Sequence, residues 1–284
     1  MFIENILRKF EFRGKRRLIR QFFGTRDGVL DHSKSRIYFD TYELIGFEMY
    51  WGGGYEKEVT WIYDYFVDRN FICLDVGANI GIHTIILCET CKHVHAFEPH
   101  PTFRKRLKSN LDLNKFANVT LHSYGLSNFS GTAILHAPPP EMKNKSATIC
   151  DINDELTEKV GIEITELDKI EDKTPHFQFM KIDCDGSDAA IILGGKKILR
   201  INKPTILFED LSWALSKGLH DRNRIRNEYT NAYNFLWSIG YEVYGVQNKF
   251  LVKLDNEPHG YENILAIHNE DKNYITAQAL VKKP

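Results

Sequence analysis

The sequence lacks any long apolar run. No stretch approaches the roughly 18–20 residues that cross a bilayer, and the N-terminus lacks the apolar segment of about 7–15 residues found in secretory signal peptides. An excess of one charge is also missing, because 37 Lys and Arg oppose 38 Asp and Glu and leave a formal net charge of −1. Nucleic-acid-binding domains are usually strongly basic. These absences predict a cytoplasmic protein with no nucleic-acid partner.

Cysteines are few and odd in number. The chain has five, and Cys73 and Cys184 lie inside strongly apolar, strand-like segments, as reduced buried thiols do. We therefore expect no disulfide framework. The segment Cys88–His95 brings two thiols and two imidazoles together, but their spacing does not follow the two-pair patterns of zinc sites. No metal site is assigned to this segment.

Basic residues gather at the N-terminus. The first twenty residues hold seven basic and two acidic side chains, a local charge of +5, and their apolar residues are spaced as in an amphipathic helix. Such a helix either contacts an anionic membrane surface or lies on the domain with its charges solvated. We favour the packed helix and treat residues 1–50 as an extension that precedes a main domain, residues 51–284.

From residue 71 onward, strands and helices alternate. Apolar runs predict strands at Phe71–Val76, Val94–Phe97, Val119–His122, Phe177–Ile182, Thr205–Phe208, Tyr241–Val246 and Ile264–His268. Helices are expected at Ile82–Cys88, Pro101–Lys115, Ala189–Leu199 and Asn223–Ile239, and an irregular stretch at 138–159. This alternation is typical of right-handed βαβ units. The sequence therefore predicts an α/β fold with a parallel sheet covered on both faces.

A glycine turn follows the first predicted strand. Asp75–Gly81 carries glycines at 77 and 81, which let the backbone turn tightly and approach a ligand. The spacing is G-x-x-x-G rather than the G-x-G-x-x-G that binds a dinucleotide pyrophosphate, and the chain has no phosphate loop. Glu98 ends the second strand, where a carboxylate can accept hydrogen bonds from both ribose hydroxyls. A nucleoside without phosphates is the ligand that fits this pair.

Several motifs, in order along the chain, resemble those of one family. They are Tyr55-Glu56, Asp75–Gly81, Phe97–Pro101, Leu107–Leu111, Gly125–Ser127, Glu166–Asp168, Lys181–Asp188, Pro204–Glu209 and Glu262–His268. Over roughly residues 50–268 they resemble the class I S-adenosylmethionine-dependent methyltransferases, specifically the FkbM-type O-methyltransferases. The resemblance implies a Rossmann-like fold with a mostly parallel, seven-stranded sheet flanked by helices, preceded by a helical or irregular extension.

The resemblance also implies a cofactor site. The cofactor would be S-adenosylmethionine, and the matching positions are Tyr55, Asp75, Gly77, Asn79, Gly81, Glu98, Leu126 and Ser127. Glu98 would hold the ribose, and Leu126 and Ser127 would lie near the adenine. The surrounding aromatic residues between 50 and 66 either line the pocket or pack on the sheet, and Tyr55 and Glu56 alone match the family there.

Three carboxylates follow the fourth strand. Where many relatives read D-x-E-G-x-E, this chain has Asp183, Asp185 and Asp188. Asp183 and Asp185 are the catalytic candidates, as a base that takes the proton of an acceptor hydroxyl. The three acids could instead bind a divalent cation, or Asp188 could cap the next helix while Asp185 faces solvent.

The expected activity is methyl transfer to a hydroxyl. The acceptor implied by the family is a small molecule or glycan, in particular a sugar or a surface polysaccharide precursor, and the basic N-terminus would suit work at the inner membrane face. Two alternatives stay open: a lipid or secondary metabolite as acceptor, and a cofactor-binding scaffold or membrane-surface module without turnover.

Overall fold

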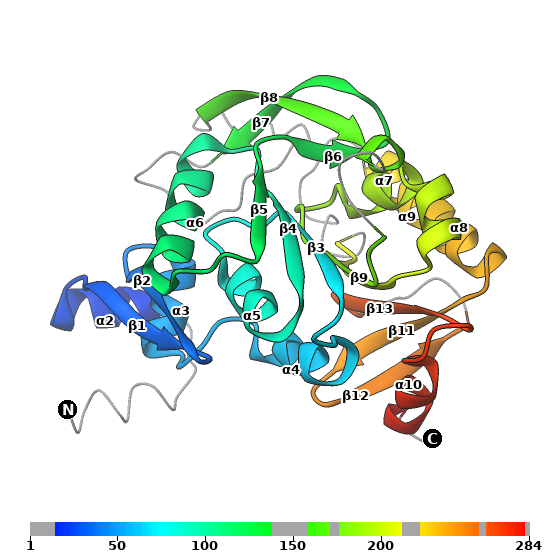
Figure 1. Ribbon diagram of the computed structural model, residues 1–284. Coiled ribbons are helices and arrows are strands. Elements are labelled where there is room, and N and C mark those ends of the chain that lie inside the picture. Colours follow the sequence, from blue (N-terminus) through cyan, green and yellow to red (C-terminus); the bar gives the residue numbers. More distant parts are fainter. Residues whose placement is uncertain (1–14, 138–157, 171–175, 212–221, 256–259, 282–284) are drawn as a thin grey trace.

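The computed structural model describes residues 15–137, 158–170, 176–211, 222–255 and 260–281 (Figure 1). Its centre is an eight-stranded sheet in the order β12-β11-β13-β10-β9-β3-β4-β5. The strands are β3 (Ile72–Val76), β4 (His93–Phe97), β5 (Val119–His122), β9 (Phe179–Ile182), β10 (Thr205–Glu209), β11 (Tyr241–Gln247), β12 (Phe250–Leu254) and β13 (Asn263–His268). The five from β10 to β5 are parallel, and β13 runs antiparallel to β10 and β11. The expected mostly parallel Rossmann-like fold is confirmed.

The strand count differs from the expected seven. β12 is the additional strand, and it forms an antiparallel hairpin with β11 at the edge of the sheet. Asn248, in the turn of this hairpin, has a left-handed φ of 50°. Of the five residues of β12 only Leu251 is buried, so the strand carries too few core residues to be recognised from an apolar run.

Helices cover both faces of the sheet (Figure 1). They are α4 (Lys57–Phe66), α5 (Ile82–Thr90), α6 (Pro101–Asn114), α7 (Asp188–Leu193), α8 (Lys196–Asn202), α9 (Arg222–Ser238) and α10 (Tyr274–Leu280). Because neighbouring strand residues point to opposite faces, Leu74 and Val76 join the core under α7 and α9, whereas Cys73 joins the core under α4 and α5. Two hydrophobic cores thus hold the sheet between them.

The helix expected at Ala189–Leu199 is two helices. The break falls at Gly194 and Gly195, between α7 and α8. A Cβ atom on Gly194 would lie 2.0 Å from the carbonyl oxygen of Ser127, so only glycine permits this close approach. The apolar spacing of the segment carried no sign of that neighbour.

A second, three-stranded sheet lies beyond the carboxyl edge of the first (Figure 1). It has the order β6-β8-β7 and consists of β6 (Gly125–Ser127), β7 (Gly131–Ala137) and β8 (Glu158–Glu166), followed by the 3-10 turn η2 (Leu167–Ile170). The start of β8 overlaps the end of the stretch that we expected to be irregular, and the rest of that stretch lies outside the described residues.

The N-terminal extension packs against the main domain. Its described elements are α2 (Lys15–Phe23), β1 (Asp27–His32), β2 (Ser35–Asp40) and α3 (Leu44–Trp51). Ile19 of α2 is buried against Phe47 and Trp51 of α3. The backbone N–H of Tyr38 on β2 donates to Asn110 Oδ1 of α6 (2.9 Å). The first fourteen residues of the predicted amphipathic segment lie outside the described residues. Within the described part, no helix has the length and apolar character to span a membrane.

Candidate functional site

The carboxyl ends of β3, β4, β9 and β10 meet at one edge of the sheet, where open α/β sheets bind ligands. Two pockets open there, one toward the second sheet and one toward α3 and α4. Both are lined by the same four residues, Gly77, Asn79, Asp183 and Asp185. The predicted glycine turn and the predicted catalytic acids therefore lie at the junction of two adjoining pockets.

The glycine turn is held tightly between two strand ends. Gly77 has a φ of +83°, and a Cβ atom there would lie 1.9 Å from the carbonyl oxygen of Asp183. The N–H groups of Gly77 and Ala78 both donate to the carbonyl of Phe97 at 3.0 Å. The turn thus bridges the ends of β3, β4 and β9, which requires the missing side chain at position 77.

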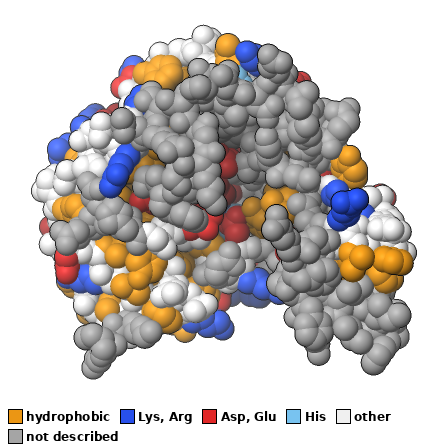
Figure 2. All heavy atoms as spheres, turned by 180° about the vertical axis from the view of Figure 1, so that it is seen from behind, with side chains coloured by type: hydrophobic (Ala, Val, Ile, Leu, Met, Phe, Trp, Pro, Cys, Tyr) orange, Lys and Arg blue, Asp and Glu red, His pale blue; other side chains and the backbone are white. Residues whose placement is uncertain are grey.

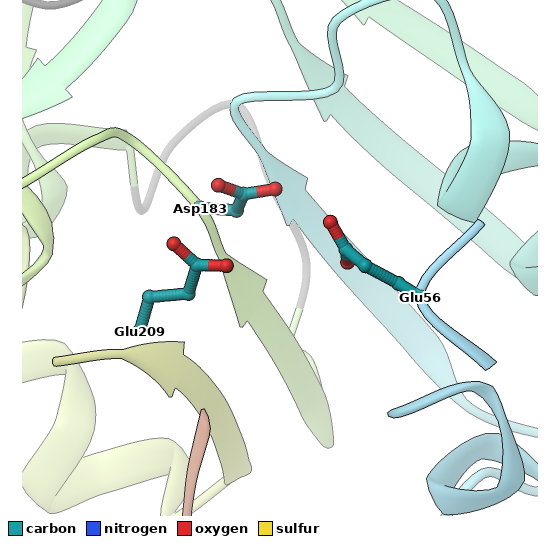
Figure 3. Close-up of side chains that lie close together, drawn as sticks. All are labelled: Glu56, Asp183 and Glu209. Atoms are coloured by element: carbon teal, nitrogen blue, oxygen red, sulfur yellow. The ribbon is translucent and has the colours of Figure 1, made fainter. Parts of the chain in front are cut away.

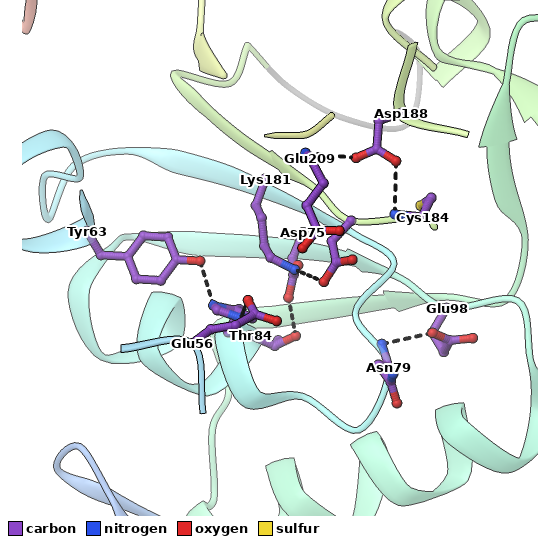
Figure 4. Close-up of polar contacts among 12 residues, drawn as sticks. Glu56, Tyr63, Asp75, Asn79, Thr84, Glu98, Lys181, Cys184, Asp188 and Glu209 are labelled. Atoms are coloured by element: carbon purple, nitrogen blue, oxygen red, sulfur yellow. Dashed lines mark hydrogen bonds and ion pairs between the residues drawn. The ribbon is translucent and has the colours of Figure 1, made fainter. Parts of the chain in front are cut away.

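Glu98 fixes the other side of the turn. Its carboxylate accepts the backbone N–H of Asn79 (2.8 Å) and that of His100 (2.7 Å), and it lines the first pocket (Figure 4). Burial raises the pKa of Glu98 to about 7, although these two backbone N–H groups oppose the shift. The carboxylate is placed to receive hydroxyl groups of a ligand in this pocket.

The first pocket has an apolar wall that sequence reasoning missed. Leu126 lines it, as predicted, together with Leu135, Ile162 and Ile164 from the second sheet. A signal was present, because Val160, Ile162 and Ile164 alternate with polar residues as a half-buried strand does. The pocket offers apolar contact to a flat ring on one side and the Glu98 carboxylate on the other.

Three predicted cofactor residues do not line either pocket among the described residues. Asp75 is fully buried and accepts a hydrogen bond from Thr84 Oγ1, and Ser127 is buried beside Gly194. Gly81 has a φ of +96°, and a Cβ atom there would lie 2.5 Å from Leu107 Cδ1. These residues shape the turn and its packing, whereas Tyr55 lines the second pocket.

Carboxylates gather in the second pocket. Oxygens of Glu56, Asp183 and Glu209 lie within 4.8 Å of one another, and the three side chains point toward a common centre (Figure 3). Seen from behind the molecule, acidic side chains fill the central recess (Figure 2). Lys181, only 4% exposed, donates from Nζ to Asp183 Oδ2 at 2.8 Å. Glu56 and Glu209 matched family landmarks, but nothing in their spacing along the chain predicted that they lie together.

Two of the three acids have strongly shifted pKa values. Burial opposes the ionisation of Glu56, but the charge and hydrogen bond of His83 outweigh it and lower the pKa of Glu56 to about 2. Burial and the charges of Asp183 and Asp188 raise the pKa of Glu209 to about 11. At neutral pH the cluster therefore holds an ionised Glu56 beside a protonated Glu209.

Asp188 has a different role from those considered on the sequence. It is fully buried, and its carboxylate accepts the N–H of Cys184 (3.2 Å) and that of Glu209 (3.1 Å). It therefore joins the ends of β9 and β10, and as the first residue of α7 it also accepts its own backbone N–H. The oxygen set that could receive a cation is Glu56, Asp183 and Glu209 instead, and a cation there would compete with the Lys181 ammonium.

These features define a class of protein before any comparison. A doubly wound sheet with a glycine turn, an acid after the second strand and no phosphate loop is an α/β protein built to bind a nucleoside-like cofactor beside a second ligand. The profile of the FkbM methyltransferase domain matches residues 75–243 of the chain. The protein belongs to the FkbM methyltransferase domain family.

The chain is also similar to individual proteins. The chain is 32% identical over 128 residues to the hexuronic acid methyltransferase AglP of Haloferax volcanii, a match that covers 45% of this chain and 51% of that protein. The chain thus matches about half the length of this curated relative. A methyltransferase FkbM from Methylobacillus flagellatus has 16% identity and a TM-score of 0.45, covering 71% of this chain and 44% of that one. An O-methyltransferase from Bacillus cereus has 14% identity and a TM-score of 0.44, covering 74% and 79%.

The geometry of the turn makes a first prediction. We expect Gly77→Ala to destabilise the protein by more than Gly24→Ala, because both positions have a left-handed φ but only a Cβ at Gly77 meets backbone. A left-handed alanine costs about 1–2 kcal/mol, and the contact with Asp183 adds roughly 1–3 kcal/mol. Urea unfolding measures both variants. Equal losses of stability would show that the turn tolerates a side chain.

Proposed function

We propose that the protein is an S-adenosylmethionine-dependent O-methyltransferase that methylates a hydroxyl group of a sugar, such as one in a surface polysaccharide precursor. The observation that carries the proposal is the pair of pockets that share Gly77, Asn79, Asp183 and Asp185. A methyl donor and an acceptor must meet in line at one point, and holding them there accounts for much of the catalysis.

The first pocket fits the adenosine part of the cofactor. Glu98 would accept hydrogen bonds from the ribose, and Leu126 with the apolar wall of the second sheet would contact the adenine. Gly77 and Asn79 would lie beside the methionine part, with Tyr55 across the second pocket. When bound, S-adenosylmethionine supplies a methyl group on a cationic sulfur.

The acceptor hydroxyl would enter from the second pocket. In the transfer the acceptor oxygen forms a bond to the methyl carbon, the bond from that carbon to sulfur breaks, and the electron pair stays on sulfur. The hydroxyl proton passes to a carboxylate, for which Asp183 is the candidate because it lines both pockets. Asp185, beside it, is the second candidate.

A sugar suits the second pocket. Its lining carries carboxylates that can each accept hydrogen bonds from hydroxyl groups. The partial similarity to a hexuronic acid methyltransferase points to the same class of acceptor. A lipid or a polyketide would require a more apolar wall than this pocket presents.

Cofactor binding is the first test. We expect S-adenosylmethionine to bind in titration calorimetry and NAD not to bind. Glu98→Gln keeps one hydrogen-bond acceptor but removes the charge, so cofactor binding weakens by about 1–3 kcal/mol. Glu163→Gln, an exposed change on the outer side of β8, serves as the control. Binding of NAD without binding of S-adenosylmethionine would contradict the proposal.

Turnover is the second test. Radiolabelled S-adenosylmethionine is offered with a panel of methyl glycosides, and we expect label in the sugar. Asp183→Asn keeps the shape, removes the charge and lowers turnover by roughly 10²–10⁴-fold, with little change in cofactor affinity. Full turnover by this variant would reject Asp183 as the base. If EDTA abolishes activity and Mg²⁺ restores it, Asp183 is a cation ligand rather than the base.

A peripheral contact with an anionic membrane is a second proposal, and α2 supports it. This helix has four basic residues and no acidic one; of the basic residues, Lys15 is buried, Arg20 donates to the carbonyl of Tyr42 and Arg17 is exposed. Ile19 faces the domain, whereas Leu18 and Phe22 are 41% and 70% exposed. Apolar side chains flanked by cations are typical of helices that lie in a lipid headgroup layer.

Vesicle binding tests this proposal. We expect the full chain to sediment with vesicles that contain phosphatidylglycerol and to release them as salt rises, because salt screens the attraction. Replacing Leu18 and Phe22 together by serine reduces this binding. Ile275→Ser, which removes a 79% exposed residue of α10, is the matched control. Equal binding by both variants would leave α2 as a packed accessory helix.

A further inference from the structure

A chain of three side chains leads from the core to the second pocket. Tyr63 of α4 is fully buried, and its hydroxyl lies 2.7 Å from His83 Nδ1 in the first turn of α5. His83 Nε2 lies 2.8 Å from Glu56 Oε2 (Figure 4). Glu56 and His83 both line the second pocket. Tyr63 has no role in the site as described so far, and His83 has only the effect on the pKa of Glu56.

The hydrogen-bond capacities of the three groups show which atom carries the proton in the contact between His83 and Glu56. An ionised carboxylate can only accept, so Nε2 of His83 carries the proton that bonds to Glu56. The Tyr63 hydroxyl can donate to Nδ1 of a neutral ring or accept from Nδ1 of a charged ring. In either state Tyr63 holds the ring in the orientation in which Nε2 donates to Glu56.

The backbone conformation of Glu56 also fixes the position of this residue. Its φ and ψ of 46° and 42° are left-handed, a conformation that a residue with a side chain adopts only where the surroundings enforce it. The residue directly precedes α4, the helix that carries Tyr63. The carboxylate is thus held by its own backbone, by His83 and by a hydrogen bond with Tyr55.

The chemistry of Glu56 suits binding better than proton transfer. The pKa of its carboxyl is lowered to about 2 by His83 and Lys181 against the effect of burial. A carboxylate that weakly basic stays ionised over the working pH range and is a poor proton acceptor. It remains a strong hydrogen-bond acceptor, since bonds to a charged group are the stronger ones.

We propose that Tyr63 and His83 are positioning residues that aim Glu56 at a second hydroxyl of the acceptor, next to the hydroxyl that is methylated. The oxygens of Glu56 and Asp183 lie within 4.8 Å of each other, so hydroxyls on neighbouring carbons can each reach one carboxylate. The acceptor is therefore a compound with adjacent hydroxyls, such as a hexopyranose, and not an isolated alcohol or a phenol. This inference rests on the proposed sugar acceptor.

The test compares variants of Tyr63 and His83 with a variant of Tyr65, which takes no part in these contacts. Tyr63→Phe removes only the hydroxyl that bonds to Nδ1, and Tyr65→Phe makes the same change at an exposed position of the same helix. His83→Leu removes the donor to Glu56, whereas the amide of His83→Gln can replace it. Kinetics use the methyl glycosides and their monodeoxy analogues, and calorimetry measures their binding in the presence of S-adenosylhomocysteine.

We expect Tyr63→Phe and His83→Leu to raise the KM of the glycoside about tenfold or more. In both variants Glu56 is no longer held in place, so the hydrogen bond between its charged carboxylate and the glycoside is lost. The kcat and the affinity for S-adenosylmethionine change less than about twofold, since no interaction made only in the transition state is lost. His83→Gln and Tyr65→Phe stay close to wild type. A monodeoxy analogue that lacks the second hydroxyl binds the wild type and Tyr63→Phe equally weakly.

Several results would overturn the inference. One is a Tyr63→Phe variant that matches Tyr65→Phe in glycoside affinity. Another is a loss of S-adenosylmethionine affinity, which would place Glu56 on the cofactor. A third is ¹⁵N NMR of histidine-labelled protein that finds His83 protonated on Nδ1 rather than Nε2. If no glycoside binds the wild type, the inference fails. Binding without methyl transfer would defeat the proposed activity but not the inference.

Discussion

The buried ammonium of Lys181 is the charge on which the second pocket depends. Lys181 lies on β9 directly beside Asp75 of β3, and it pairs with Asp183. Burial acts to lower its pKa, but the carboxylates of Asp183, Asp75 and Glu56 raise it well above the usual value. Without this cation, several carboxylates would be left at the end of the sheet with no balancing charge, a costly arrangement in a buried place.

The single ammonium of Lys181 does not balance the charge of all these acids. The acids of the site therefore differ in how their pKa values are shifted. His83 supplies a hydrogen bond that keeps Glu56 ionised, whereas burial and the neighbouring carboxylates raise the pKa of Glu209 and keep it protonated against the effect of Lys181. Neighbouring carboxylates whose environments push their pKa values apart take different roles. The same pocket thereby offers a permanent hydrogen-bond acceptor, an ion-paired carboxylate and a carboxylic acid within reach of one ligand.

The sequence supported the parts of the fold that rest on local patterns. Apolar runs located the parallel strands, and the glycine turn with Glu98 located the first pocket. It failed where a distant neighbour decides the outcome. Position 194 requires glycine because the Ser127 carbonyl lies against it, and Asp188 links two strand ends because the Glu209 N–H lies beside it. Neither contact leaves a trace in the spacing of residues along the chain.

The sequence by itself determined the type of fold, the glycine turn and the positions of the acids after the fourth strand, because each is carried by a local pattern of residues. Only the tertiary structure decided which acids act together. Glu56, Asp183 and Glu209 come from a loop and two strand ends far apart in the chain. A carboxylate's protonation depends on the charges and burial around it, and these are fixed only when the sheet brings Lys181 and His83 to the same place.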